Sequence, residues 1–527
     1  MSKTESESYM STNYTRKRTG NIKDIAQYVD MYGHELEEEW NNIPWLNLKK
    51  NIFDLQQRIF HAEINKEYTK ARNLQRKLLI DDSALLYSIR RVTEINEGKK
   101  TPGIDNMVIK TDAERMALYY KLKERSVFLH RAHPVRRVYI DKKNGKKRPL
   151  GIPTIIDRIY QMVVKLALEP RAEAWFEPCS YGFRPFRGVE HAIAKIFHDT
   201  KGHKKVWVFE GDFKSCFDTL NHDFILNQLE NFPAKKVIKS WLKAGYLYNG
   251  CLNITDTGTP QGGIISPLLA NMALHGMEEA LGIKYKRVVD KLGIINFHNL
   301  SKYTCVRYAD DFVVLCHTKE DAEDVYRLLE PYLEERGLTL AEDKTLITHM
   351  DDGFDFLGFN IRNYHSQERD KVLVKPSRER IKACKAKISK IFNEHHGKDI
   401  GLLIQKINPY LVGVANFWKM GSAKKIFGDI DEHVWTCTKR YLHRQHPDKG
   451  DNWIRDKYLK EDYTQKSGYS YILTDPDEPK LQVRKMKEIR IKYAKMIKHD
   501  CTPYNREYAA YIYMKYRASA FHRLYGD

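Results

Sequence analysis

The sequence lacks the cysteine pairs, long apolar runs and repeats that mark several common classes of protein. Its eight cysteines are scattered, with no Cys-x-x-Cys pair and no Cys/His cluster at the spacing of zinc ligands. No apolar run approaches the roughly 20 residues that cross a bilayer, and the N-terminal stretch MSKTESESYMSTNYTRKRTG lacks the apolar core of a secretory signal. These absences predict reduced thiols, a cytoplasmic location in a bacterial cytosol or nucleoid, and no role in a membrane.

A surplus of positive charge dominates the composition. Lys and Arg total 89 against 69 Asp and Glu, which gives +20 over 527 residues. This balance favours a polyanionic partner, through counterion release and electrostatic steering, although a basic protein without such a partner can share it. The length suggests about two to four domains, with enough apolar residues to form their cores.

The pattern of apolar residues changes along the chain. The first 25 residues or so are polar, and from Phe53 to about Val92 apolar residues recur at helical spacing with Lys and Arg between them. Between about 130 and 365, β-type runs such as KVWVF and FDFLGFNI alternate with helical stretches, which predicts an α+β domain. From Pro376 to about Tyr458 the pattern is helical again, with a lysine-rich face that is either a solvated surface or a helix along a phosphate backbone.

Three acidic residues follow two apolar runs. In YTCVRYADDFVVLCH, Asp310 and Asp311 lie where a hairpin tip is expected, and in KVWVFEGDFKSCFDTLNH an apolar strand leads to Asp212. A Tyr-x-Asp-Asp turn alone is weak evidence, but if the two strands are neighbours the acids form an oxygen-rich site for two Mg²⁺ ions. Such a site suits phosphoryl transfer from a nucleotide to a 3′-hydroxyl. Because successive strand side chains alternate, we expect Asp212 and Asp310 to bridge the ions and Asp311 to contribute less.

These residues lie in a series of recognisable blocks. KKRPLGIPTIIDRIYQ, SYGFRP, GTPQGGIISPLLANM, YADD and FDFLGF occur in the order of the sequence blocks of reverse transcriptases, and their wording most resembles the enzymes encoded by group II introns. The resemblance extends to RRVTEINEGKKTPGID and INPYLVGVANFWKM, and covers Trp40 to near Arg517. It implies an α+β right-hand polymerase, with a palm of antiparallel strands backed by helices and a helical thumb.

The resemblance also implies a division into domains. We expect a disordered tail at 1–35, a helical N-terminal extension at 36–110, fingers and palm at 111–365, a thumb or maturase domain at 366–460, and a DNA-binding region at 461–527. In relatives an HNH nuclease with Cys-x-x-Cys pairs follows that region, and after Asp500 this chain has only Cys501 and His522. We therefore expect no endonuclease and a primer from another source.

Several roles of single residues follow from the same resemblance. Lys142 and Arg148 match the cations that contact the incoming triphosphate, although neighbouring lysines compete with Lys142 and both could merely decorate a hairpin. Phe217 matches the aromatic gate that excludes a ribose 2′-hydroxyl, with a core phenylalanine as the alternative. Phe213, next to Asp212, is assigned to the nucleotide and metal site, and Gln261 in PQGG to the nascent base pair.

Further assignments concern other residues of the proposed active site and the thumb. Lys344 in LAEDKTLI matches a palm lysine near the active site, and Gly358 in FDFLGF belongs to the primer-grip block. Arg184 in SYGFRP is either a template or nucleotide contact or part of an internal salt bridge. Trp418, Phe417 and Tyr410 are assigned to the thumb core rather than to stacking platforms.

The resemblance implies an RNA-directed DNA polymerase that also binds its own intron RNA as a maturase. Its partners would be group II intron RNA, an RNA template with a DNA primer, target DNA and dNTPs, and its cofactor two Mg²⁺ ions; the oligomeric state stays open. Two alternatives remain: a splicing maturase with an idle polymerase site, and a host-adopted enzyme of this type in repair or defence. The three acids argue against the idle site.

Overall fold

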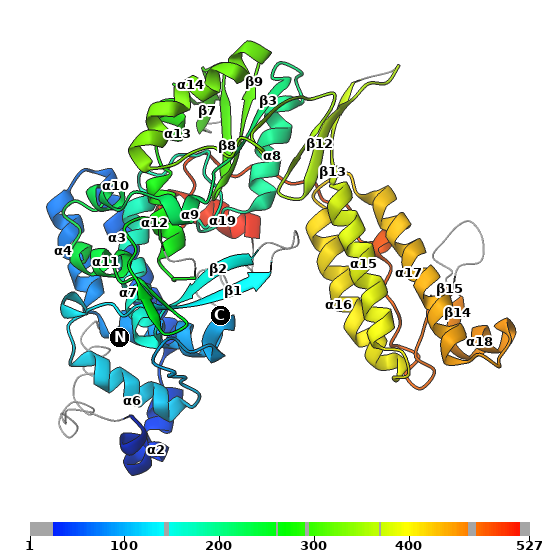
Figure 1. The fold of residues 1–527 in the computed structure, drawn as a ribbon, viewed down its shortest axis with the longest axis horizontal. Coiled ribbons are helices and arrows are strands. Elements are labelled where there is room, and N and C mark those ends of the chain that lie inside the picture. Colours follow the sequence, from blue (N-terminus) through cyan, green and yellow to red (C-terminus); the bar gives the residue numbers. More distant parts are fainter. Residues whose placement is uncertain are drawn as a thin grey trace.

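The computed structural model describes residues 25–141, 147–259, 262–289, 295–367, 370–461 and 471–516. Figure 1 shows a large lobe that holds both the N-terminal helices and the main sheet, and a helical thumb that projects from it to one side. Within the described residues, no helix is long and apolar enough to cross a membrane. All eight cysteines are free, and seven of them are buried.

The N-terminal extension is a bundle whose helices bury one apolar face each. In α3, Leu48, Ile52, Leu55 and Ile59 recur at helical spacing and are buried. Helix α6 begins with a capping box, in which the side chains of Thr111 and Glu114 each accept a hydrogen bond from the other's backbone N–H group. The bundle comprises α2 (Ile25–Asn41), α3 (Trp45–Ile64), α4 (Tyr68–Leu79), α5 (Asp82–Arg90) and α6 (Asp112–Lys123), with the short turns η1 (Arg91–Ile95), η2 (Glu97–Lys100) and η3 (Val127–Leu129).

Two predicted boundaries of this extension are wrong. Residues 25–35 were assigned to a disordered tail, but they form the first eleven of the 17 residues of α2, which buries Leu36 and Trp40 further along. The extension was also predicted to end at 110, yet α6 packs along α2. The extension therefore runs from Ile25 to Lys123. Its first helix was mistaken for a tail because a polar helix with a narrow apolar stripe resembles a tail in composition.

The palm is built on a four-stranded antiparallel sheet of order β10-β3-β9-β8. Side chains of β9 alternate between two cores: Phe312 and Val314 face the core shared with the N-terminal bundle, while Val313 and Leu315 face the core shared with the thumb. The strands are β3 (Trp207–Asp212), β8 (Thr304–Tyr308), β9 (Asp311–Cys316) and β10 (Leu346–His349). The helices are α8 (Val189–Thr200), α9 (Cys216–Thr219), α10 (His222–Gln228), α11 (Lys235–Leu242), α12 (Ser266–Ala273), α13 (Met277–Ala280) and α14 (Lys319–Arg336), and a separate hairpin pairs β6 (Tyr285–Val289) with β7 (Ile295–Asn299).

The fingers sheet has the order β2-β1-β4-β5. It brings together segments about 100 residues apart in sequence, because β1 pairs with β4 in parallel. Helix α7 follows the sheet, capped by the Thr154 side chain, which accepts from the Asp157 N–H. The elements are β1 (Val135–Asp141), β2 (Lys147–Ile152), β4 (Tyr246–Tyr248), β5 (Cys251–Asn253) and α7 (Ile155–Glu173).

The thumb follows a small antiparallel sheet of order β11-β12-β13. In α15, Cys384, Ile388 and Ile391 are buried. Trp418, at the end of α16, is buried as predicted, while Phe417 is 40% exposed. The strands are β11 (Phe354–Phe356), β12 (Phe359–Tyr364) and β13 (Lys371–Pro376). The thumb itself comprises α15 (Arg378–Glu394), α16 (Ile400–Trp418), α17 (Lys424–Gln445), α18 (Asp451–Tyr458), β14 (Leu459–Glu461) and β15 (Tyr471–Leu473).

Within the predicted DNA-binding region, 461–527, most of the described residues form a strap along the molecule, and DNA binding by this region stays a prediction. We call residues 484–508 the C-terminal strap; they include the turns η4 (Met486–Glu488) and η5 (Arg506–Tyr508), and α19 (Ala509–Tyr516) follows them. Near the thumb, the Lys492 N–H donates to the Lys419 carbonyl at 2.9 Å. Further on, the Tyr504 hydroxyl donates to Glu169 at 2.8 Å. The strap thus ties the thumb to the large lobe, where α19 lies (Figure 1).

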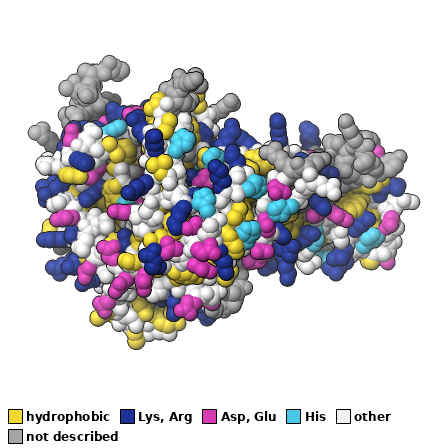
Figure 2. Space-filling view, turned by 90° about the horizontal axis from the view of Figure 1, so that it is seen from above, with side chains coloured by type: hydrophobic (Ala, Val, Ile, Leu, Met, Phe, Trp, Pro, Cys, Tyr) yellow, Lys and Arg dark blue, Asp and Glu magenta, His cyan; other side chains and the backbone are white. Residues whose placement is uncertain are grey.

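Positive charge covers both parts of the molecule. Figure 2 shows Lys and Arg side chains over the large lobe and over the thumb in the same view. On α15 the lysines at 382, 387 and 390 are exposed opposite its buried stripe, and on α4 Arg72, Arg76 and Lys77 are exposed opposite Leu74 and Leu78. The sequence left open whether the thumb face is merely solvated, and its exposure fits either alternative.

Candidate functional site

The three acids meet at one end of the palm sheet. In the pairing of β3 with β9, Asp212 lies directly opposite Asp311, so their side chains are on the same face of the sheet. Asp310 lies in the two-residue turn between β8 and β9, in which Tyr308 pairs with Asp311 and Ala309 has a φ of +58°. The neighbouring strands that the sequence could only suppose are present, and they gather Asp212, Asp310 and Asp311.

The geometric reason for ranking Asp310 above Asp311 as a metal ligand does not hold in the structure. The alternation of strand side chains was expected to separate Asp310 from Asp311 and to favour Asp310 as the partner of Asp212. Asp310 is a turn residue, however, so the alternation does not apply to it, and it is Asp311 that the register sets opposite Asp212. The lesser role of Asp311 stays a prediction.

A buried hydrogen-bond network holds the turn between β8 and β9, which we call the catalytic turn. The guanidinium of Arg307, only 1% exposed, donates to the Ala309 carbonyl and to the Asn271 side chain, each at 3.1 Å. Asn271 in turn donates to the Gly182 carbonyl at 2.7 Å. A Cβ at Gly182 would lie 2.4 Å from the Ala309 nitrogen, so only glycine allows this contact. The sequence reading missed Arg307 and Asn271, although an arginine inside an apolar strand was a visible signal.

The loop before Gly182 extends this support. Backbone hydrogen bonds join Tyr181 and Cys179 to Arg307, each at 2.8 Å, so the SYGFRP segment lies beside β8 as an added strand partner. The catalytic turn therefore packs on a rigid surface, which holds its carboxylates in place.

Burial and neighbouring negative charge raise the pKa of two of these acids, Asp310 and Asp311. Burial raises the pKa of Asp311 to about 6, and the nearby charges of Asp310 and Asp212 add to this, while Lys344 opposes it. Burial also raises the pKa of Asp310, with Asp212 adding and Arg148 and Arg307 opposing. Mutual repulsion at partly exposed carboxylates is the arrangement that a divalent cation relieves, so the donor set fits Mg²⁺ or a similar hard ion.

Lys344 lies at this site, as predicted. Its ammonium contacts the Asp212 carboxylate at 2.7 Å, and this hydrogen bond raises the pKa of Lys344. Lys344 comes from the segment after α14, which reaches the end of β3 because the Ala341 N–H donates to the Asp212 carbonyl at 2.8 Å. Two segments more than 120 residues apart thus meet at one carboxylate.

Two predicted nucleotide residues border the triad. Arg148 on β2 is close enough to lower the pKa of Asp310, so the fingers sheet faces the catalytic turn. Phe217 in α9 is half-buried, and its carbonyl accepts from the Thr259 N–H at 2.6 Å. The segment that leads to Gln261 therefore lies against α9, and Gly262, with a φ of +116°, packs its Cα against the Gly151 carbonyl of β2.

Two other predictions lie outside the described residues. Lys142 falls in the gap at 142–146 and Gln261 in the gap at 260–261. Their roles stay predictions.

Phe213 does not offer its ring to a nucleotide. It is 4% exposed, and its ring lies 5.0 Å from that of Phe312 in the core below the sheet. A contact with a ligand can therefore come only from its backbone. The ring belongs to the core because the residue after the end of β3 turns back toward the apolar face, and the assignment of Phe213 to the nucleotide and metal site stays a prediction that concerns its backbone.

The template role predicted for Arg184 is also wrong, and its alternative is confirmed. The guanidinium forms a two-pronged salt bridge with Glu173, both contacts at 2.8 Å, and the two side chains are 2% and 1% exposed. It also donates to the backbone carbonyls of Glu177 and Ser180. The exposed side chain of this motif is instead Phe183, at 52%, which has a φ of +58° beside the catalytic turn.

Gly358 occupies a tight turn between β11 and β12. Leu357 and Gly358 both have positive φ, as a two-residue hairpin turn requires, and the Gly358 carbonyl accepts from Ser377 at the start of α15. The primer-grip block thus joins the palm to the thumb. Its contact with a primer stays a prediction.

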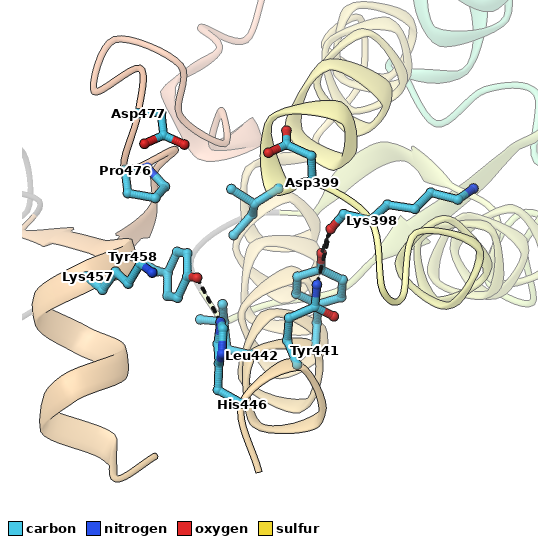
Figure 3. A pocket seen from close by; sticks show the side chains of 11 residues that line it. Lys398, Asp399, Tyr441, Leu442, His446, Lys457, Tyr458, Pro476 and Asp477 are labelled. Atoms are coloured by element: carbon cyan, nitrogen blue, oxygen red, sulfur yellow. Dashed lines mark hydrogen bonds between the residues drawn. The ribbon is translucent and has the colours of Figure 1, made fainter. Parts of the chain in front are cut away.

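Three other polar clusters have partners within the protein. The hollow at the end of the thumb, about 190 Å³, is drawn in Figure 3. There the Lys398 carbonyl accepts from the Tyr441 hydroxyl at 3.1 Å and from Gln445 at 3.2 Å, and His446 contacts the Tyr458 hydroxyl at 2.7 Å. These hydrogen bonds connect α17 to its neighbours.

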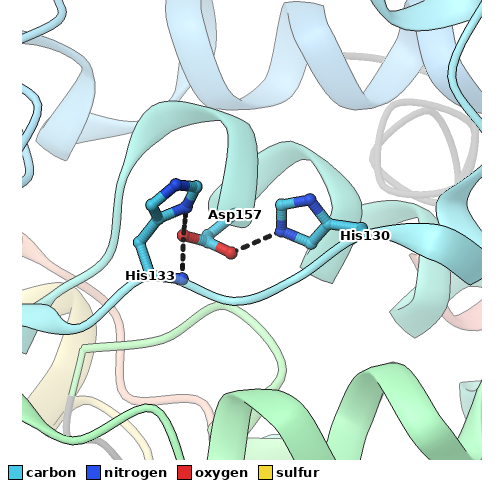
Figure 4. Close-up of side chains that lie close together, drawn as sticks. All are labelled: His130, His133 and Asp157. Atoms are coloured by element: carbon cyan, nitrogen blue, oxygen red, sulfur yellow. Dashed lines mark hydrogen bonds and ion pairs between the residues drawn. The ribbon is translucent and has the colours of Figure 1, made fainter.

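His130, His133 and Asp157 form the second cluster (Figure 4). Asp157 contacts His130 at 2.6 Å and accepts from Thr154 and Trp241 at 2.6 and 3.0 Å. Burial alone would raise the pKa of Asp157, but these hydrogen bonds outweigh it and lower the pKa. Asp157 also accepts from the His133 backbone N–H at 3.3 Å, so the carboxylate anchors residues 130–133 to the start of α7.

The third cluster contains Glu177, Cys179 and Glu278. The Glu177 carboxylate accepts from four successive backbone N–H groups, those of residues 276–279 at the start of α13, at 2.9 to 3.2 Å. It serves as an anion at the helix N-terminus.

Comparison with known proteins agrees with this geometry. The family described as reverse transcriptase (RNA-dependent DNA polymerase) matches residues 140–361, the N-terminal domain of reverse transcriptase matches 40–122, and the maturase-specific domain of group II introns matches 381–459. Protein YkfC of Escherichia coli is 35% identical over 55% of this chain and 83% of its own length. The group II intron-encoded protein LtrA of Lactococcus lactis is 33% identical over 51% of this chain and 53% of its own length.

A longer match reaches the thumb. The putative COX1/OXI3 intron 2 protein of Saccharomyces cerevisiae is 24% identical over 75% of this chain and 50% of its own length. The chain therefore spans about half the length of LtrA and of the yeast intron 2 protein. Fold, acid triad and matched domains together define a reverse transcriptase. More narrowly, the chain belongs to the reverse transcriptases of the group II intron type, with an RNA-dependent DNA polymerase domain joined to a maturase domain.

Proposed function

We propose that this protein extends a DNA primer on an RNA template and that it binds a group II intron RNA as a maturase, in support of splicing and retrohoming. The observation that carries the polymerase activity is the meeting of Asp212, Asp310 and Asp311 at one end of the palm sheet, with Arg148 of the fingers facing it. Family membership supports the choice of an RNA template.

The side chains of the cleft have distinct tasks in this proposal. Asp212, Asp310 and Asp311 would hold two Mg²⁺ ions, which activate a 3′-hydroxyl and stabilise the pyrophosphate leaving group when bound. Arg148 neutralises charge on the triphosphate of the incoming dNTP, and Lys344 holds Asp212 in position. Phe217 contacts the sugar and excludes a 2′-hydroxyl.

Binding of intron RNA would use the exposed basic faces of the N-terminal extension and the thumb. The arginines and lysine of α4, and the lysines of α15, point away from their buried stripes. Structured RNA is recognised mainly through shape and backbone, which suits such faces. Target DNA as a partner, and the cytoplasmic location, belong to the proposal as well.

Primer extension tests the polymerase activity directly. We expect the wild type to extend a DNA primer on a poly-ribonucleotide template in the presence of Mg²⁺, and Asp310→Ala to lose this activity. An inactive wild type that still binds intron RNA would instead support a maturase with an idle polymerase site. A coding sequence that lies within a folded intron would support the intron role over a host-adopted enzyme.

A further inference from the structure

A groove lies in the thumb between α17 and the segment from β15 to the C-terminal strap. Its volume is about 340 Å³, within the range of roughly 300–1,000 Å³ found for small-molecule sites. Helix α17 contributes Gly428, Trp435 and Thr438, β15 contributes Tyr471, and the strap contributes Arg484. The groove is distant in sequence from the polymerase residues and has no role in the function proposed above.

Two aromatic rings form one wall of the groove. Trp435 and Tyr471 are nearly parallel, at 18°, with centroids 6.4 Å apart, and both are only half-buried. The ammonium of Lys439 lies 5.1 Å from the Trp435 ring centroid. Exposed parallel rings with a cation nearby are a stacking surface for a nucleobase, whose flat π-face extends the stack.

Positive charge predominates around this wall. Arg484, Lys485 and Lys487 line the groove, in addition to Lys439 beside Trp435. Of the two acids that line it, Asp431 accepts from the backbone N–H groups of Met486 and Lys487 at 2.8 and 2.9 Å, and Glu432 is exposed. Four cations against these two acids suit a phosphate beside the stacked base.

One residue that lines the groove is a glycine, Gly428. Gly428 lies within α17, where glycine is disfavoured relative to alanine. Its φ is not positive, and a Cβ built on it would meet no atom within 4 Å. The space beside Gly428 is therefore open, and a larger side chain at this position would enter the groove.

We propose that this groove binds one unpaired nucleotide of an RNA, with the base stacked on the pair formed by Trp435 and Tyr471 and the phosphate beside Lys439 and Arg484. The choice of RNA rather than another polyanion rests on the proposed function. The groove gives the thumb a contact with a single base, in addition to the backbone contacts expected of its lysine-rich face.

Site-specific photo-crosslinking tests the groove. The full chain is mixed with an unstructured 20-nucleotide RNA that carries 4-thiouridine, irradiated, and analysed by mass spectrometry for crosslinks to Trp435 and Tyr471. Gly428→Gln fills the groove while raising helix propensity, and Gly413→Gln is the matched control, because Gly413 is exposed within α16 and also has nothing within 4 Å of its Cβ.

We expect crosslinks at the groove in the wild type and in Gly413→Gln, and a drop of about fivefold or more in Gly428→Gln. No crosslink at the groove, or equal yields in the two variants, would overturn the proposal. Equal crosslinking of single-stranded DNA would support a nucleotide site and overturn its assignment to RNA. Primer extension by the wild type separates the two proposals, since a chain that extends primers without a groove crosslink rejects only the groove.

Discussion

Replacement of Arg184 by alanine should destabilise the protein rather than weaken template binding alone. The guanidinium and the Glu173 carboxylate are 2% and 1% exposed, so the variant would leave an uncompensated charge in the core. Removal of one partner of such a pair costs about 3–5 kcal/mol. For a domain of 150–250 residues this corresponds to a fall of roughly 6–20 °C in the unfolding midpoint. The backbone carbonyls of Glu177 and Ser180 would lose their donor as well.

Thermal unfolding of the wild type and of Arg184→Ala measures this effect. Arg327→Ala is the matched control, because Arg327 forms an ion pair with Asp324 while 72% exposed, and exposed pairs contribute at most about 1 kcal/mol. We expect the control to unfold close to the wild type. The reasoning would be refuted if Arg184→Ala kept the wild-type midpoint and lost template affinity, since that result restores the role of a template contact.

Three other changes probe the site and the core. Asp310→Asn should reduce primer extension by about 10²-fold or more, because bound ions supply several kcal/mol of transition-state stabilisation, and Asp311→Asn should reduce it less; equal losses contradict that ranking. Phe217→Val should admit ribonucleotides, measured as the ratio of ribonucleotide to deoxynucleotide incorporation, and an unchanged ratio removes its role as a gate. Burial, and then the charge of Glu177, raises the pKa of Glu278 from 4.5 to about 8. The protonated acid therefore stabilises the fold fully below pH 4.5 and loses this contribution as the pH rises through 8, so urea unfolding should show a decline of about 3 kcal/mol between pH 5 and 7.5 that Glu278→Gln lacks.

The sequence was most informative where a residue's task follows from local pattern. The apolar run before Asp212 predicted a strand that ends in an acid, and the two apolar runs around YADD predicted a hairpin with the acids near its tip; both are present. Helical spacing predicted the buried stripe of α15. These features depend on the intrinsic period of strand and helix, which the order of apolar and polar residues records directly.

The sequence could not rank residues whose task depends on distant partners. Arg184 looks the same as a surface cation until Glu173, the last residue of α7, is seen to be buried against it. Phe213 and Phe217 are both phenylalanines near Asp212, and only the turn at the end of β3 sends one into the core and leaves the other half-buried. The extent of the N-terminal extension was misjudged for the same reason, because α6 belongs to it only through its packing on α2.

The order of residues thus predicted the class of chemistry, through the acids that follow the apolar runs and through the resemblance of the sequence blocks to reverse transcriptases. Tertiary structure alone decided which strands are neighbours, so that Asp212 lies opposite Asp311, and which buried groups fix the turn between them. It also decided that the chain after the thumb returns to the large lobe as a strap. Hydrogen-bond register and burial arise from contacts between segments far apart in the chain, and no local pattern encodes them.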